Sequence, residues 1–524
     1  MGNKTLIIPA VVGALSAFYE QDAPAAAVSV GTATCTAPSA FPTDVGMLGK
    51  IRDGANPFKA QEDKLNVTWT GDHPAIELRW LPKNAARDGA RSEDIFRNLG
   101  PASPYSPAKD LFPETIPYEA VPAQCTVKQV HMIYRHGARY PTKGRKKGPG
   151  HVGKRIDKAK RHGAFEASGD LAFLNDWTYT LGKGKLVRQG GQDMFNAGAH
   201  AYYQYAELMD KLTEHKPVIR TTSQSRMLDS ARYWSLGFVG WDAATKVELE
   251  VLPEGPAWNS TLSPKHACPN AHNKEKKLGR KRASVWGKEY LPALVERLQP
   301  MVKGLDLTTD DVFNMMALCA YETAALGYSA FCPVFTKTEY ESFEYSFDLG
   351  FHGDHGFGSE TGRAEGMGWV GEFSDRLAKK PFEGPITSQN GTVDSNATYF
   401  PLDQPVFVDF THDTVLMAIL TTLNMTQFDG TMDVHHPDPH RIFRASRVTP
   451  FGARLVFEVM ECAEGETTTD YIRTKINEAI IPLNEDQGCT KRSDGLCRLD
   501  AFIAHTKKVY NAAHFAESCF AHPR

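Results

Sequence analysis

Two arginines and a histidine directly follow an apolar run in the first third of the chain. Residues 127–134 are rich in β-branched and aromatic side chains, which predicts a buried strand that ends at Arg135, His136, Gly137 and Arg139. Charged groups rarely follow a buried strand without partners, because burying them alone is costly. Guanidinium groups match phosphate oxygens, and a glycine lets the backbone approach a ligand closely. The segment therefore indicates an oxyanion site, in which the histidine can be a nucleophile, an acid–base group or a hydrogen-bond donor.

Two further apolar runs end in polar side chains in the same way. The run that begins at Pro217 leads to Arg226, and the run that begins at Pro405 leads to His412 and Asp413. A helical pattern follows each of them, and a helix start directs backbone N–H groups toward an anion. A His-Asp pair alone is weak evidence of a site. Because open α/β sheets bind ligands beyond the carboxyl ends of their strands, the three segments can converge on one crevice.

The eight residues 135–142, Arg-His-Gly-Ala-Arg-Tyr-Pro-Thr, resemble the signature of the histidine acid phosphatases, the family that includes the phytases. Residues 169–179 are similar to a stretch found in some fungal acid phosphatases and phytases. The resemblance covers roughly residues 120–524. It implies an α/β fold with a phosphoglycerate-mutase-like central sheet, helices on both faces of that sheet, and a mainly helical insertion that forms a cap.

The resemblance also implies a mechanism that needs no metal or other cofactor. His136 would attack phosphorus and form a phosphohistidine, and Asp413 would protonate the leaving alkoxide. Four side chains would hold the phosphate oxygens: Arg135, Arg139, Arg226 and His412. Because a free aspartic acid titrates near 4, such an enzyme should work at acidic pH.

A second copy of the first four signature letters provides an internal control. Residues 161–164 read Arg-His-Gly-Ala, but they follow basic residues instead of a strand, and Phe165 stands where the second arginine should be. We predict that this copy lies in solvent.

A basic run lies between the two copies of these letters. Its first lysines begin seven residues after His136, and the run as a whole can be an ordinary solvated face or partly a rim of the pocket. In the second interpretation three lysines bind the distal phosphates of the substrate: Lys143, Lys146 and Lys147. This favours phytate, inositol hexakisphosphate, as the substrate. The alternatives are a broad-specificity acid phosphatase and, in another class, a non-catalytic relative that binds polyanions.

Several features predict a secreted glycoprotein. Residues 1–27 contain Lys4, an apolar stretch and small residues near Ala25, in the order of a signal peptide. Five Asn-x-Ser/Thr sequons follow: Asn66, Asn259, Asn390, Asn396 and Asn424. The net charge of −3 excludes a chain built mainly to bind nucleic acid, and no apolar run of about 18 residues beyond the signal predicts a membrane span.

Nine cysteines agree with an oxidising compartment, but spacing alone leaves their pairing open. The resemblance implies four disulfides: Cys125–Cys462, Cys268–Cys519, Cys319–Cys332 and Cys489–Cys497. Cys35 is left over.

The chain is expected to divide into three parts after cleavage of the signal. Residues 28–120 are rich in Pro, Gly and Ala and predict an irregular arm. The α/β part should comprise residues 121–150, 211–254 and 395–524, and the cap residues 151–210 and 255–394.

Within the cap we expect helices over 285–302, 309–326 and 363–377, a glycine-rich loop over 350–362 and a solvated basic loop over 274–282. The group of His435, His436 and His440 lies among Pro and Asp without helical spacing, which favours an exposed turn over a metal site.

Overall fold

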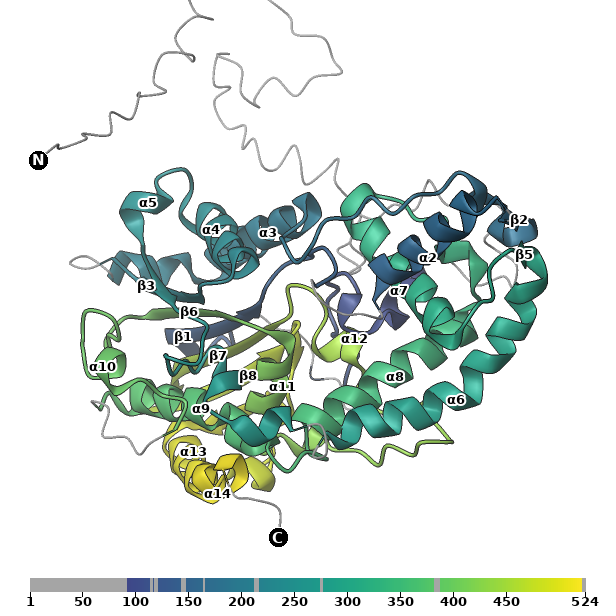
Figure 1. Ribbon diagram of the computed structural model, residues 1–524. Helices are drawn as coiled ribbons and strands as arrows, with labels where there is room; N and C mark the ends of the chain where they lie inside the picture. Colours follow the sequence, from purple (N-terminus) through teal and green to yellow (C-terminus); the bar gives the residue numbers. More distant parts are fainter. Residues whose placement is uncertain are drawn as a thin grey trace, which may run out of the picture. The chain divides into compact units, whose positions relative to one another are not determined.

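A long strand, β1 (Cys125–Arg135), forms the middle of the sheet in the computed structural model of this chain. The structure describes residues 92–113, 116, 121–142, 148–163, 165–211, 216–273, 277–380 and 387–520, all within the unit Gly71–Arg524. Seven consecutive residues at the end of β1 are buried, as its apolar sequence predicts. The strands run in the order β10-β8-β7-β1-β6-β3-β4, with β9 added beside β8. Figure 1 labels β8, β7, β1, β6 and β3 of this sheet.

One half of the sheet is parallel and carries the predicted chemistry at one edge. β1 pairs in parallel with β6 (Val406–Thr411), which pairs with β3 (Val218–Thr222), and β3 pairs with β4 (Glu248–Leu252). Arg135 lies opposite Thr411 in this register. The segments that follow β1, β3 and β6 therefore leave the sheet on the same side.

The other half of the sheet is antiparallel. Its strands are β7 (Arg454–Glu464), β8 (Thr467–Ile476), β9 (Ala479–Ile480) and β10 (Leu496–Arg498). The disulfide between Cys125 and Cys462 joins β1 to β7 where the two residues lie opposite each other. Sheets of this mixed kind are common in α/β proteins.

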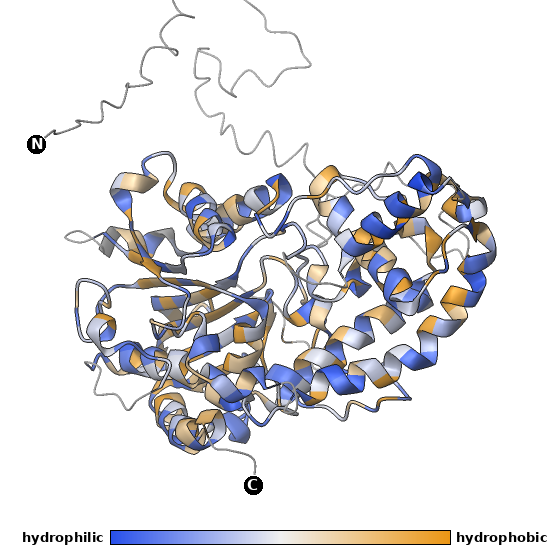
Figure 2. Ribbon diagram, in the orientation of Figure 1, coloured by the Kyte–Doolittle hydropathy of each residue, from blue (hydrophilic) through white to orange (hydrophobic). Residues whose placement is uncertain are grey.

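Alternate residues of β1 face two different helical layers. Val130, Met132 and Tyr134 pack in one apolar cluster with α3 (Arg188–Tyr205) and α4 (Ser225–Val239). His131 and Ile133 lie on the opposite face, which is covered by α9 (Gly362–Ala378), α11 (Asp413–Thr422) and α13 (Leu499–Ala512). The predicted α/β fold with helices on both faces of the sheet is confirmed. Figure 2 shows the buried strands as largely hydrophobic, whereas the surrounding helices carry both hydrophobic and hydrophilic residues.

A group of helices lies beside the sheet, at the right in Figure 1. It contains α2 (Pro149–Arg161), α6 (Leu278–Leu298), α7 (Thr309–Leu326) and α8 (Lys337–His355), with α6 packed on α7 and α8. α3 and α9 fall in the ranges predicted for the cap, yet they pack on the sheet. The limits of the α/β part and the cap stay a prediction.

Two predicted loops of this region are wrong in part. α8 continues through Gly350 and Gly353 to His355, so the predicted loop over 350–362 begins only after that residue. A side-chain carbon at Gly353 would lie 2.5 Å from Gly279, so glycine permits the close crossing of α8 and α6 and does not interrupt the helix. α6 begins at Leu278, so the end of the predicted basic loop over 274–282 is helical, and Lys277 before it is buried.

The four disulfides are those that the resemblance implies. Cys35, the arm before residue 92 and the proposed signal lie outside the described residues. No helix in the described part of the chain combines the length and the apolar character that a membrane span requires.

Candidate active site

His136 lies immediately after β1, and it is only 1% exposed. Its Nδ1 lies 2.9 Å from the carbonyl oxygen of Gly137. Because a carbonyl can only accept, Nδ1 must carry the proton, and the lone pair is on Nε2. Burial, followed by the charges of three nearby arginines and His412, lowers the pKa of His136 well below its ordinary value. The neutral imidazole with a free Nε2 is the form that a nucleophile requires.

Close backbone contacts hold the segment after His136. A side-chain carbon on Gly137 would lie 2.3 Å from the carbonyl oxygen of Gly190 near the start of α3, so no larger residue fits there. The N–H of Gly137 donates to Ser230 Oγ at 3.1 Å, and that hydroxyl donates to the carbonyl of Arg226 at 2.6 Å. α3 and α4 thus fix the loop, and the same contact places the start of α4 beside it.

Three guanidinium groups lie around the histidine: Arg135, Arg139 and Arg226. The Nε atom of each is buried and has no hydrogen-bond partner among the described residues. Burial lowers the pKa of Arg135 to about 10, and burial together with Arg139 lowers the pKa of Arg226 to about 10. Arg135 and Arg226 therefore remain charged at acidic pH. Mutually repelling guanidinium groups with unused, buried Nε donors form a site for an anion.

His412 and Asp413 enter the site from the end of β6 and the start of α11. The ring of His412 lies 5.9 Å from the ring of His136, edge to face. Asp413 Oδ2 lies 2.7 Å from Arg135 Nη2, and Oδ1 accepts the N–H of Thr414 at 2.9 Å. Burial raises the pKa of Asp413, but the positive charges of Arg135, Arg139 and His412 outweigh burial and lower it. In the free site this group is therefore a carboxylate.

Glu254 is a member of the site that sequence reasoning missed. Its Oε1 lies 2.9 Å from His412 Nε2, and the same carboxylate accepts from Thr222 and Gln224. Burial opposes its ionisation, but His412 and these donors lower the pKa of Glu254 to about 2. Glu254 thus orients His412 through the hydrogen bond at His412 Nε2. The signal that could have found Glu254 is its place two residues after β4, at the end of the fourth parallel strand.

The structure brings together all six residues predicted to be catalytic. The second Arg-His-Gly copy is exposed at the end of α2, as predicted. Lys143, Lys146 and Lys147 lie outside the described residues, so their role stays a prediction. His435, His436 and His440 are exposed, and His435 pairs with Glu289 at 3.2 Å. Among the described residues, no group of three or more His, Cys, Asp or Glu is arranged to hold a metal ion.

The sequence model of the histidine phosphatase superfamily (branch 2) matches residues 126–477. Phytase A of Emericella nidulans is 32% identical over 418 residues, which cover 76% of this chain and 86% of the relative. Phytase A of Aspergillus oryzae is 30% identical over 80% of this chain and 90% of the relative. The crystal structure of the phytase from D. castellii shares the fold, with a TM-score of 0.68, 24% identity, and coverage of 85% of this chain and 93% of that one. The chain therefore belongs to branch 2 of the histidine phosphatase superfamily and is a histidine acid phosphatase.

Proposed function

We propose that this phosphatase hydrolyses phytate through a covalent phosphohistidine at His136. The observation that carries the proposal is the neutral, buried imidazole, whose free Nε2 lies among three guanidinium groups with unused donors. A phosphate group held by these donors would face Nε2 for attack in line with the leaving oxygen.

In the first step the lone pair of Nε2 forms a bond to phosphorus, and the bond from phosphorus to the alkoxide oxygen breaks. Asp413 gives its proton to that oxygen, because an alkoxide leaves poorly without one. In the second step water attacks phosphorus, the bond to Nε2 breaks, and Asp413 takes up a proton from the water. Inorganic phosphate is released, and both groups return to their starting state.

Asp413 must be protonated for the first step, although it is a carboxylate in the free site. A bound phosphate places negative charge beside Arg135 and Arg139, the groups that lower the pKa of Asp413. Their influence on Asp413 falls, and its affinity for a proton rises. Substrate binding thus prepares the general acid, most effectively at acidic pH.

Phytate as the substrate is supported by the relatives that are named phytases and by the proposed rim of Lys143, Lys146 and Lys147. Several cations beside a site for one phosphate favour a substrate with further phosphates. The alternative, a broad-specificity acid phosphatase, requires only the inner site. Release of phosphate from p-nitrophenyl phosphate in excess chelator tests the metal-free mechanism. Comparison of kcat/KM for phytate and p-nitrophenyl phosphate distinguishes the two substrate classes, and equal values would favour the broad-specificity enzyme.

The rim is tested by changing its three lysines to serine. We expect KM for phytate to rise roughly tenfold, since weak exposed charge contacts add together on one polyanion. KM for p-nitrophenyl phosphate should barely change. The control variant removes three exposed charges of α2: Lys154, Lys158 and Arg161. If both variants raise KM for phytate equally, the effect is one of general charge, and the lysines do not form the rim.

We also propose that the enzyme is secreted and glycosylated. Four disulfides are typical of oxidising compartments. Asn396 is exposed, whereas the amide of Asn424 binds Arg363 and the carbonyl of Asp486. Mass spectrometry of the secreted protein should therefore find glycan on Asn396 and none on Asn424.

A further inference from the structure

Two carboxyl groups of α8 are buried side by side without contact to solvent. Glu344 and Asp348 are one helical turn apart, and both are 0% exposed. Like charges at this spacing repel each other, and an isolated buried carboxylate is costly. Burial and the neighbouring Asp348 raise the pKa of Glu344 to about 8. Such a pair is retained only where its oxygens have partners.

The partners are backbone N–H groups of two segments that are distant in the chain. Glu344 Oε2 accepts from Gly100 N–H at 2.7 Å, and its Oε1 accepts from Ser446 N–H at 2.8 Å. Asp348 Oδ1 accepts from Ala445 N–H at 2.7 Å, and its other oxygen is paired with Arg441. The pair therefore joins η4 (Gly100–Ala102) to the start of α12 (Ala445–Val448).

These two segments meet again at Arg135. The carbonyl oxygens of Pro101 and Thr449 both accept from Arg135 Nη1, the second at 2.7 Å. Pro101 directly follows Gly100, and Thr449 directly follows α12. Nη2 of the same guanidinium holds Asp413, and Nε is left without a partner. The two carbonyls thus determine which part of Arg135 remains free.

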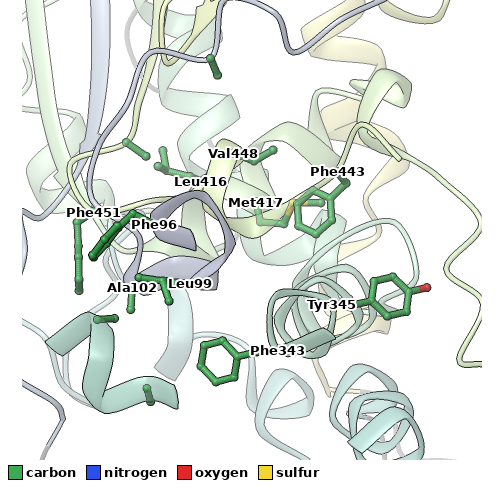
Figure 3. Packing of buried hydrophobic residues seen from close by; sticks show 14 of the residues in the cluster. Phe96, Leu99, Ala102, Phe343, Tyr345, Leu416, Met417, Phe443, Val448 and Phe451 are labelled. Carbon is green, nitrogen blue, oxygen red and sulfur yellow. The ribbon is translucent and has the colours of Figure 1, made fainter. Parts of the chain in front are cut away.

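Apolar contacts also hold η4 and the segment after α12 against α8. Figure 3 shows Phe96 near Phe451, with Leu99 on the side toward Phe343 of α8. These side chains belong to one buried cluster. Phe451 also lies 4.5 Å from the guanidinium carbon of Arg135. The backbone of Gly100 has a φ of +58°, and a side-chain carbon there would lie 2.4 Å from the ring of Phe347, so glycine is required beside α8.

We propose that Glu344 and Asp348 are positioning residues, which hold the two carbonyl groups that orient Arg135 toward phosphate and Asp413. The inference rests on the proposed function. The carboxyl pair touches no reacting atom and acts only through the Gly100–Pro101 turn and the 445–449 segment. A purely structural pair would stabilise the fold without influencing phosphate affinity.

The test is the variant Glu344→Gln, which retains one acceptor and replaces the other by a donor that faces an N–H group. We expect the Ki for inorganic phosphate and the KM for p-nitrophenyl phosphate to rise about tenfold, the effect of misplacing the hydrogen bond that the Arg135 guanidinium donates to phosphate. The matched control is Asp354→Asn, also on α8, where the carboxylate is buried and accepts from the N–H groups of Gly279 and Arg280 without a path to Arg135. It should lower the melting temperature while leaving Ki unchanged.

An unchanged Ki in Glu344→Gln would overturn the inference, and so would equal rises of Ki in both variants. If Glu344→Gln does not fold, Asp348→Asn is measured against the same control with the same expectations. A parent enzyme without phosphatase activity would instead refute the proposed function.

Discussion

Two arginine clusters lie along the same two strands, and the pKa values of their arginines are shifted in opposite directions. Within β3 and β6, Arg220 pairs with Asp409 through two hydrogen bonds of 2.8 and 2.9 Å, and Arg376 adds a third at 3.1 Å. Glu372 Oε2 accepts from Nη2 of Arg220 at 2.7 Å, the nitrogen that also donates to Asp409. A few residues further along, after the ends of these strands, Arg226 and Asp413 belong to the phosphate site. We call the first group the buried network.

The surroundings of the two arginines shift their pKa values in opposite directions. Burial would lower the pKa of Arg220, but Asp409 and Glu372 raise it well above its ordinary value. Burial and Arg139 lower the pKa of Arg226 to about 10. Arginines with matched carboxylates hold a fold together, whereas arginines without them are stabilised only when an anion arrives. The number of carboxylate partners distinguishes the two roles.

The largest effect should come from removing the nucleophile. His136→Ala should reduce turnover roughly 10⁴-fold or more, because no phosphohistidine can form. Thermal unfolding should change little, since this imidazole takes no part in the buried network. The control, His162→Ala in the exposed copy at the end of α2, should retain parent kinetics. Substantial turnover by the His136 variant would remove the covalent mechanism.

The second prediction exchanges a carboxylate of the network for an amide. Asp409→Asn should lower the free energy of unfolding by roughly 3–5 kcal/mol, because it leaves Arg220 and Arg376 buried beside one uncharged group. In contrast, Arg226→Met should lower kcat/KM by roughly 10²–10³-fold with little loss of stability. Denaturant unfolding and steady-state kinetics of both variants measure the contrast. If Arg226→Met is the less stable of the two, the distinction between the clusters is wrong.

The third prediction concerns the proton that Asp413 supplies. Asp413→Asn should lower kcat for phytate by roughly 10²–10⁴-fold, since the alkoxide then leaves without a proton. For p-nitrophenyl phosphate, whose leaving group needs little protonation, the loss should be clearly smaller. Equal losses for the two substrates would mean that Asp413 serves only to hold Arg135.

The smallest expected effect is on the pH dependence of the melting temperature, which should differ between carboxyl groups near the network and those of the site. Two carboxyl groups lie near the network: burial raises the pKa of Asp394 to about 8 and that of Glu250 to about 7, and both are influenced by Arg220 and Glu372. Their contribution to stability is complete below about pH 4 and is lost as the pH rises toward 7 and 8. Glu254 of the site, with a pKa lowered to about 2, contributes above about pH 4 and loses its contribution as the pH falls toward 2. These carboxyl groups by themselves favour a melting temperature that is highest near pH 4–5. The lowered pKa of His136 acts in the opposite direction, because a buried neutral imidazole costs stability as the pH falls below about 6.5, so the test compares the parent with a variant.

The variant Asp394→Asn sharpens this test, because it removes one of the two carboxyl groups whose pKa is raised near the network. Between pH 5 and 8 its melting temperature should increase relative to that of the parent, while the decline below pH 4 stays unchanged. If the parent and Asp394→Asn show the same change of melting temperature between pH 5 and 8, the pKa of Asp394 is not raised.

The sequence by itself determined where the chemistry lies along the chain. The apolar runs before Arg135, Arg226 and His412 are local patterns, and a strand that ends in such residues can be recognised without knowing its neighbours. The family signature then supplied roles for these residues and implied the four disulfides that the structure contains. The limits of the cap and the role of the three lysines of the rim remain predictions from the sequence.

Only the tertiary structure decided which groups support the site. Glu254 lies 158 residues from His412, and Glu344 lies 244 residues from Gly100, so no local spacing relates them. Each is a carboxyl that would be solvated in most sequences, and its partners exist only because the chain brings distant backbone and side-chain donors to it. The glycines of α8 were misjudged for the same reason. Gly353 weakens a helix considered alone, but the contact with Gly279 of another helix requires it there.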